Sequence, residues 1–155
     1  MKKLTLLLAL ALVITALAGC APKEGLGTGT IEDFYAAVEP MFDTKAMAEL
    51  AYDNILRNLK IDAELVDSAK VMVPTGTNQD EFGIFIAAPG RGQDLETALN
   101  AYITRRQDAW MDEYLPEERP KIFDAEVIAH GDHILYVMAT SDRRRAASKA
   151  FMDAM

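Results

Sequence analysis

Two pairs of short apolar runs, each pair joined by turn-forming residues, constrain the fold of this chain most. Residues 69–74 and 81–88 read AKVMVP and EFGIFIAA, and the cluster TGTNQD between them favours a turn. Residues 121–130 and 133–140 read KIFDAEVIAH and HILYVMAT, and the Gly-Asp pair between them suits a two-residue turn with positive φ. Because two hairpins cannot bury an apolar face alone, the pattern predicts one antiparallel sheet of about four strands.

Four other segments carry apolar residues at helical spacing. The predicted helices cover residues 31 to about 39, 44–59, about 94 to about 114, and 143–155. The first is expected to begin with a capping box formed by Thr30 and Asp33 and to end at Pro40. The last is expected to be capped by Ser141 or Asp142. Together with the hairpins, these helices predict an α+β fold. We expect a single two-layer domain over residues 31–155, with the helices packed on one face of the sheet.

The first twenty residues have the layout of an export signal. Lys2 and Lys3 precede an apolar run over residues 4–17, which is shorter than the about 20 residues needed to span a bilayer. The run ends in LAGC, which resembles the lipobox of bacterial lipoproteins. In that class the cysteine receives a diacylglyceryl group, and cleavage occurs just before it. The pattern therefore predicts a signal peptide at residues 1–19 and an acylated Cys20; the other interpretation is a free thiol that ends a signal.

Cys20 is the only cysteine, and two acyl chains on it would hold the protein at the membrane. Residues 20–30 are then the acylated N-terminus and a flexible tether, because APKEGLGTGT carries three glycines and one proline. Without Lys2 and Lys3 the formal charge falls from −8 to about −10, which argues against binding nucleic acid or anionic lipid by charge. We expect a cell-membrane protein, lipid-anchored on the extracytoplasmic face.

Four stretches carry a family resemblance that begins at about Leu56. They read LKIDAELVDSAKVMVP, EFGIFIA, LNAYITRRQDAWMDEYLPEERPKI and HGDHILYVMATSD. In this respect the chain resembles a family of bacterial lipoproteins, frequent in Gram-positive anaerobes, known as domain of unknown function 4358. The matching positions are Arg106, Trp110, Tyr114, Pro116, Glu117, Gly131, Ser141 and Asp142. The resemblance implies a lipoprotein context and no established reaction.

His130 and His133, the two histidines of the chain, flank the predicted turn. In a two-residue hairpin they pair across the strands with Cβ atoms about 5 Å apart. That separation permits a shared metal ion, and Asp132 would be a third ligand. The alternative is a pair of solvated histidines at a hairpin tip.

Two further features are candidates for ligand binding. Arg91 lies in PGRGQ, just ahead of the long helix, where free backbone amides attract anions; a strand-to-helix connection that needs flexible φ values explains the glycines equally well. Trp110 and Tyr114, with Tyr102, would line a small-molecule groove or belong to the core.

Arg106 stands among these aromatic residues in a helix expected to face the sheet. We predict that it pairs with a buried or half-buried carboxylate, and the candidate partners are Asp112, Glu113, Asp124 and Glu126. The run Arg143 to Arg145 opposes the dipole of the last helix, so it indicates either an acidic partner or ion pairs with neighbouring acids.

No nucleophile, zinc-protease or phosphate-loop motif is visible. The sequence therefore favours a non-enzymatic, lipid-anchored domain that needs no cofactor and binds a protein or a small ligand. The alternative is a metal-dependent protein or enzyme that uses the tip at residues 130–133. A third interpretation, the solute-capturing component of a transporter, is disfavoured because one small domain offers no second lobe.

Overall fold

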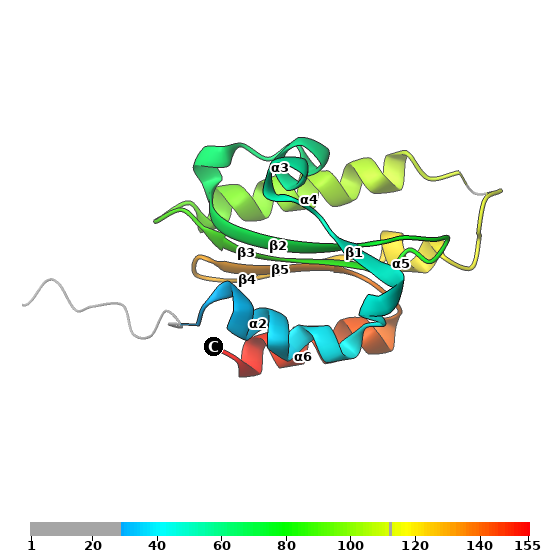
Figure 1. Cartoon of the computed structure of the whole chain (residues 1–155). Coiled ribbons are helices and arrows are strands. Elements are labelled where there is room, and N and C mark those ends of the chain that lie inside the picture. The colour runs from blue at the N-terminus through cyan, green and yellow to red at the C-terminus, as the bar shows by residue number, and fades with distance from the viewer. Residues whose placement is uncertain (1–28, 112) are drawn as a thin grey trace, which may run out of the picture.

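The computed structural model of the protein describes residues 29–111 and 113–155. These residues form a five-stranded antiparallel sheet with helices on both faces (Figure 1). The strands lie in the order β1-β2-β3-β5-β4, and their bounds are β1 Met47–Glu49, β2 Val66–Pro74, β3 Glu81–Ala87, β4 Glu126–His130 and β5 His133–Met138. The predicted α+β class and both hairpins are confirmed, whereas the sheet has five strands rather than about four.

The helices form the two outer layers. The helices α2 (Ile31–Val38) and α6 (Ser141–Asp153) cover one face, α3 (Tyr52–Leu59) and α4 (Gly92–Asp108) cover the other, and the short α5 (Arg119–Phe123) lies near the end of α4 (Figure 1). Short 3₁₀ turns occupy Glu39–Met41, Thr44–Ala46 and Ala63–Leu65. The domain therefore has three layers, and the expectation of helices on a single face is corrected.

The reason for the third layer is visible in β5. Its residues alternate between two apolar cores: Ile134 and Tyr136 pack with α3 and α4, whereas Leu135 and Val137 pack with α2 and α6. All four side chains are fully buried. A continuous apolar run is typical of a strand in a sheet covered on both sides, so the run ILYVM over residues 134–138 indicates helices on each face.

The segment predicted as one helix over residues 44–59 is divided. Its first part forms a 3₁₀ turn and then β1, which pairs antiparallel with β2 so that Met47 lies opposite Pro74. Leu50 then donates its backbone N–H to the carbonyl of Val71, at 2.9 Å, and only Tyr52–Leu59 is helical. Pairing with the edge of the sheet outweighed the local helical spacing, because the strand satisfies backbone groups that the edge would otherwise leave open.

Two boundaries after β3 also differ from the prediction. The helix α4 ends at Asp108 instead of at about residue 114. Residues 119–123, with Pro120 in the first turn, form α5, so the strand predicted over 121–130 begins only at Glu126. Proline suits the first turn of a helix, where its missing N–H is not needed. Residues 109–118, which join the two helices and of which all but residue 112 are described, are called the α4–α5 connector below.

The N-termini of the first and last described helices, α2 and α6, are capped differently. Thr30 and Asp33 form the predicted capping box, with Thr30 N donating to Asp33 Oδ2 at 2.8 Å. The N-cap position of the last helix is Thr140 rather than Ser141 or Asp142, and the Thr140 side chain makes no capping hydrogen bond. The predicted signal peptide, Cys20 and nearly all of the tether lie outside the described residues. Among the residues that are described, no helix is long and apolar enough to cross a membrane.

Candidate functional site

Two adjacent carboxylates, Asp80 and Glu81, are buried where β3 begins. Their exposed fractions are 3% and 1%. Because successive residues of an extended chain point to opposite faces, Glu81 lies against α4, and Asp80 lies against α5 and the start of α6. A buried carboxylate is strongly destabilising unless donors satisfy it, so the side chains around these two residues define the site.

Glu81 has a donor for each oxygen. Its Oε1 accepts hydrogen bonds from the hydroxyls of Tyr102 and Tyr136, at 2.6 and 2.8 Å, and its Oε2 accepts from Arg106 at 2.6 Å. Arg106 also donates to the Tyr102 hydroxyl at 2.8 Å and to Gln79 Oε1 at 3.1 Å. Burial, and then the charge of Glu81, raise the pKa of both tyrosines, which keeps them protonated as donors.

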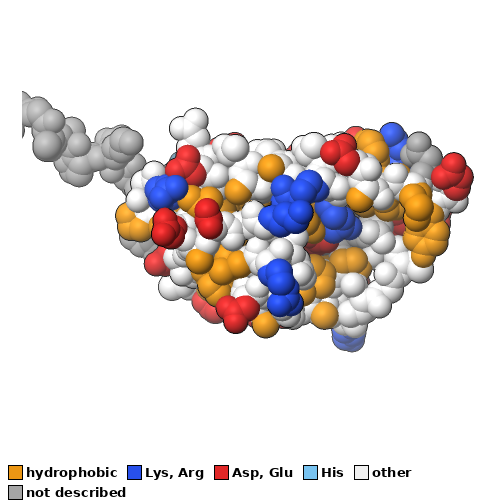
Figure 2. All heavy atoms as spheres, turned by 90° about the horizontal axis from the view of Figure 1, so that it is seen from above, with side chains coloured by type: hydrophobic (Ala, Val, Ile, Leu, Met, Phe, Trp, Pro, Cys, Tyr) orange, Lys and Arg blue, Asp and Glu red, His pale blue; other side chains and the backbone are white. Residues whose placement is uncertain are grey.

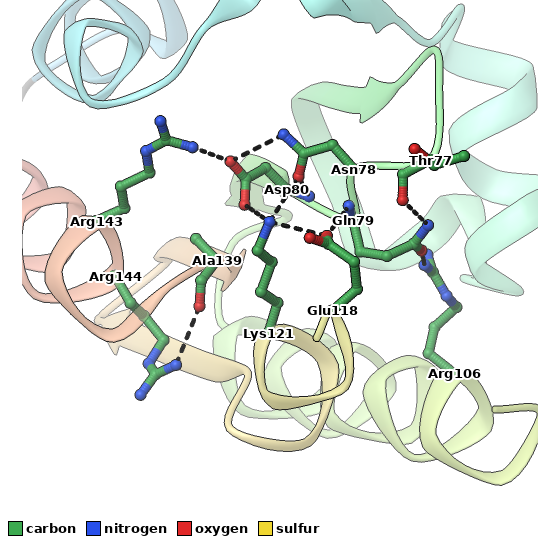
Figure 3. A network of polar contacts seen from close by, with 10 residues as sticks. All are labelled: Thr77, Asn78, Gln79, Asp80, Arg106, Glu118, Lys121, Ala139, Arg143 and Arg144. Atoms are coloured by element: carbon green, nitrogen blue, oxygen red, sulfur yellow. Dashed lines mark hydrogen bonds and ion pairs between the residues drawn. The ribbon is translucent and has the colours of Figure 1, made fainter. Parts of the chain in front are cut away.

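Asp80 is surrounded by cations (Figure 3). Lys121 Nζ lies 3.1 Å from its Oδ1, and Arg143 of α6 pairs with its Oδ2. Lys121 also donates to Asn78 Oδ1 and to Glu118 Oε2, each at 2.8 Å. Within the described residues no hydrogen bond reaches Asp80 Oδ1, so Lys121 stabilises this oxygen through the ion pair alone.

We call Asp80, Glu81 and the side chains bonded to them the carboxylate network. It joins the β2–β3 turn to α4, α5 and α6. The oxygens of Glu81 and the ammonium of Lys121 are occupied by protein partners. A general base or nucleophile needs an open side toward its substrate, which neither group has here. The geometry therefore gives the network a role in holding this end of the molecule together.

The network corrects the partner predicted for Arg106. Arg106 does pair with a buried carboxylate, but that carboxylate is Glu81, which was not among the four candidates. Sequence reasoning missed Asp80, Glu81 and Lys121 altogether. One signal for Glu81 was available: it shares its strand face with Phe85 and Ala87, which are core residues, so the period of two places its side chain inward.

Each of the three arginines at the start of α6 forms an ion pair. The pairs are Arg143–Asp80, Arg144–Glu126 and Arg145–Asp142. Arg144 is 9% exposed, and it also donates to the carbonyl of Ala139 at 3.2 Å. Of the two interpretations of this run, the geometry supports ion pairs with neighbouring acids.

The hairpin tip has the predicted register, with His130 opposite His133. His130 is exposed, whereas His133 is buried and its ring centroid lies 5.0 Å from that of Phe34 in α2. The carbonyl of Asp132 accepts a hydrogen bond from Ala87 N at 2.7 Å. No three or more His, Cys, Asp and Glu side chains within residues 29–111 and 113–155 are grouped so as to hold a metal ion. Metal binding at the tip stays a prediction.

Arg91 lies at the N-cap of α4, where its Nε is 2.7 Å from Asp94 Oδ2. Gly90 has a φ of 75°, and a Cβ on Gly92 would lie 2.3 Å from the carbonyl oxygen of Gly131. Positive φ and a close backbone approach each require glycine. The geometry of the connection therefore explains both glycines without a bound anion.

The predicted aromatic set is split between core and surface. Tyr102 is 7% exposed and Trp110 packs against the core on the α4 side, whereas Tyr114 lies beyond the helix and is 55% exposed. Met111 is 65% exposed. Seen from the side of α3 and α4, hydrophobic side chains form several patches, and one of them lies at the right-hand end, where α4 finishes in Figure 1 (Figure 2).

The α4–α5 connector is fixed at both of its ends. Trp110 N donates to the carbonyl of Gln107 at 3.1 Å, and Glu118 Oε2 accepts a hydrogen bond from Gln79 N at 2.6 Å. Between these points Leu115 has a φ of 49°, a left-handed conformation that is uncommon for leucine. Such strained residues occur preferentially at functional sites. Tyr114 is thus presented next to a strained residue on an anchored segment.

Comparison with known proteins identifies a family. The family described as Domain of unknown function (DUF4358) matches residues 41–139, well over half of the chain. The matched range contains Asp80, Glu81, the connector and the tyrosines of the network, whereas Arg143 lies beyond it. No curated protein and no solved structure matches the chain.

Proposed function

The chain belongs to the DUF4358 family, whose description names no activity, and we propose that it is a lipid-anchored, non-enzymatic accessory domain that binds a protein partner. Acylated Cys20 holds it at the extracytoplasmic face of the cell membrane, and the α4–α5 connector makes the contact. The observation that carries this proposal is the exposure of Met111 and Tyr114 on a segment anchored at both ends.

The residue types on the connector favour a protein partner. Tyrosine, tryptophan and methionine are enriched at the centres of protein interfaces. Tyr114 offers a large apolar ring with a polar tip, and Trp110 packs against the core at the base of the connector. Because Trp110 and Glu118 fix the two ends of the connector, its ordering on binding costs less conformational entropy than that of a segment without such contacts.

The placement of the connector also suits an anchored domain. Residues 29 and 30 lead into α2 at the left-hand end of Figure 1, whereas the connector lies at the right-hand end. A tether over residues 21–30 would reach at most about 35 Å from the anchor. The connector then lies at the end of the domain away from the point where the tether attaches, where a partner has access to it.

Site-specific photocrosslinking tests the binding proposal. A photoreactive amino acid replaces Tyr114 in the full-length protein, in the membranes of its own cell. Tyr52 of α3, which is 40% exposed, is replaced in the same way as the matched control. We expect a discrete protein adduct from position 114 that is absent from position 52. Identical adducts from both positions, or none from position 114, would contradict the proposal.

The lipid anchor has a separate test. Cys20→Ser should leave the precursor uncleaved or release the protein from membranes, because no acyl chain can be attached. Lipid labelling and membrane fractionation measure both effects. Unchanged labelling of the Cys20→Ser variant would exclude acylation at this residue.

A further inference from the structure

We infer that the partner presents a basic surface around the pocket that receives Met111 and Tyr114. This inference rests on the proposed function of the α4–α5 connector and adds the chemistry of the partner. Residues 107–118 read QDAWMDEYLPEE and contain five acidic residues and no lysine or arginine. The exposed apolar side chains of the connector are therefore set in an acidic segment.

The exposed carboxylates flank the apolar side chains. Asp108 precedes Met111, Glu113 directly precedes Tyr114, and Glu117 follows them; all three are exposed. The acid that ends the connector has a different role, because Glu118 is bound by Lys121 and by the backbone of Gln79. Three exposed acids therefore lie within three positions of Met111 or Tyr114 along the chain.

Neighbouring cations do not cancel this charge. Arg106 is paired with Glu81, which lies outside the connector, and Lys121 divides its contacts between Asp80 and Glu118. Residues 106–121, which include these two cations and Arg119, still have a formal charge of −2. The segment remains negative when its flanks are counted.

An apolar centre with a charged rim is the usual anatomy of a protein interface. Charge at the rim selects a partner of opposite sign and speeds association. An acidic rim therefore fits a lysine- or arginine-rich protein surface, and it would be repelled by anionic lipid.

The test places a photoreactive amino acid at position 111 of the full-length, lipidated protein and measures the adduct yield after brief illumination. In one variant the rim is neutral: Asp108→Asn, Glu113→Gln and Glu117→Gln. The matched control neutralises three exposed acids near the start of β2, Asp62→Asn, Glu64→Gln and Asp67→Asn. We expect about a tenfold lower yield for the neutral rim and no change for the control.

Salt provides a second measurement that does not depend on the folding of any variant. Raising the salt concentration from about 0.1 to about 1 M shortens the Debye length from about 10 to about 3 Å, and it should lower the adduct yield of the unmodified rim to a similar extent. The crosslinked peptide of the partner should contain lysine or arginine.

The outcomes separate this inference from the proposed function. A protein adduct whose yield resists both charge neutralisation and salt would overturn the basic-partner inference and leave the binding proposal intact. An adduct to lipid, or no adduct at position 111 or 114 above the Tyr52 control, would overturn both.

Discussion

The carboxylate network and the α4–α5 connector lie at the same end of the molecule but are opposite in exposure. Asp80 and Glu81 are 3% and 1% exposed, whereas Tyr114 and Met111 are 55% and 65% exposed. The two carboxylates of the network are paired with cations of the protein, so they stabilise the fold without being accessible themselves. The connector is accessible and contributes little to the core. The comparison teaches that stability and recognition depend on different residues here, although Glu118 links the two regions.

The largest effect on stability is expected from Glu81→Gln. The variant leaves the charge of Arg106 half-buried without its carboxylate and turns an amide group toward donors, so the free energy of unfolding should fall by about 3 to 5 kcal/mol. Urea denaturation of the mature protein measures this. Glu49→Gln is the control, because Glu49 is 56% exposed and 3.6 Å from Lys70, and it should cost less than about 0.5 kcal/mol. Equal losses for the two variants would contradict the role of the network.

A smaller loss, about 2 to 3 kcal/mol, is expected from Asp80→Asn. After this change Lys121 keeps Glu118 and Asn78, and the side chain of Arg143, which is 41% exposed, can be hydrated. The same urea experiment applies, with Asp142→Asn as the control because both members of its ion pair are exposed. The smaller loss is expected because the partners of Asp80 keep other partners or can be hydrated. A larger loss of unfolding free energy for Asp80→Asn than for Glu81→Gln would contradict this reasoning.

The tyrosines of the network predict a dependence on alkaline pH. Burial and Glu81 raise the folded-state pKa of Tyr102 and Tyr136 above the ordinary value of 10.0, so the unfolded chain loses these protons first. Their contribution is complete below about pH 10 and is lost as the pH rises above it. Tyr102→Phe should cost about 1.5 kcal/mol at pH 8, and its stability should decline less steeply between pH 9 and 11. Urea unfolding of the variant and the parent protein between pH 9 and 11 measures this dependence. If the unfolding free energies of the two proteins fell in parallel, the pH dependence would not come from Tyr102.

The smallest effect on stability is expected from Tyr114→Ala. The exposed ring should change the free energy of unfolding by no more than about 0.5 kcal/mol, yet crosslinking from position 111 should be lost. A stability loss above about 1 kcal/mol would mean that Tyr114 belongs to the fold. The contrast between the connector and the network would then disappear.

Local sequence patterns predicted much of the fold. Turn residues placed both hairpins and the register of His130 with His133, and Thr30 with Asp33 marked the start of α2. The predicted bounds were wrong where pairing with a distant element outweighed local helical spacing. The example is β1, which was predicted as part of a helix but pairs with β2. The candidate site was predicted only in part: Arg106 was expected to pair with a carboxylate and does so, Tyr114 was expected either to line a groove or to belong to the core, and Asp80 and Glu81 were not foreseen.

The sequence by itself determined that two hairpins form, where they turn, and the acidic character of the connector, because these properties depend on residues a few positions apart. Only the tertiary structure decided which cation meets which carboxylate and how many layers the sheet supports. Glu81 illustrates the reason: its donors Tyr102, Arg106 and Tyr136 lie 21, 25 and 55 positions away along the chain. Packing of α4 and β5 against β3 brings these groups within hydrogen-bonding distance, and no local pattern encodes that packing.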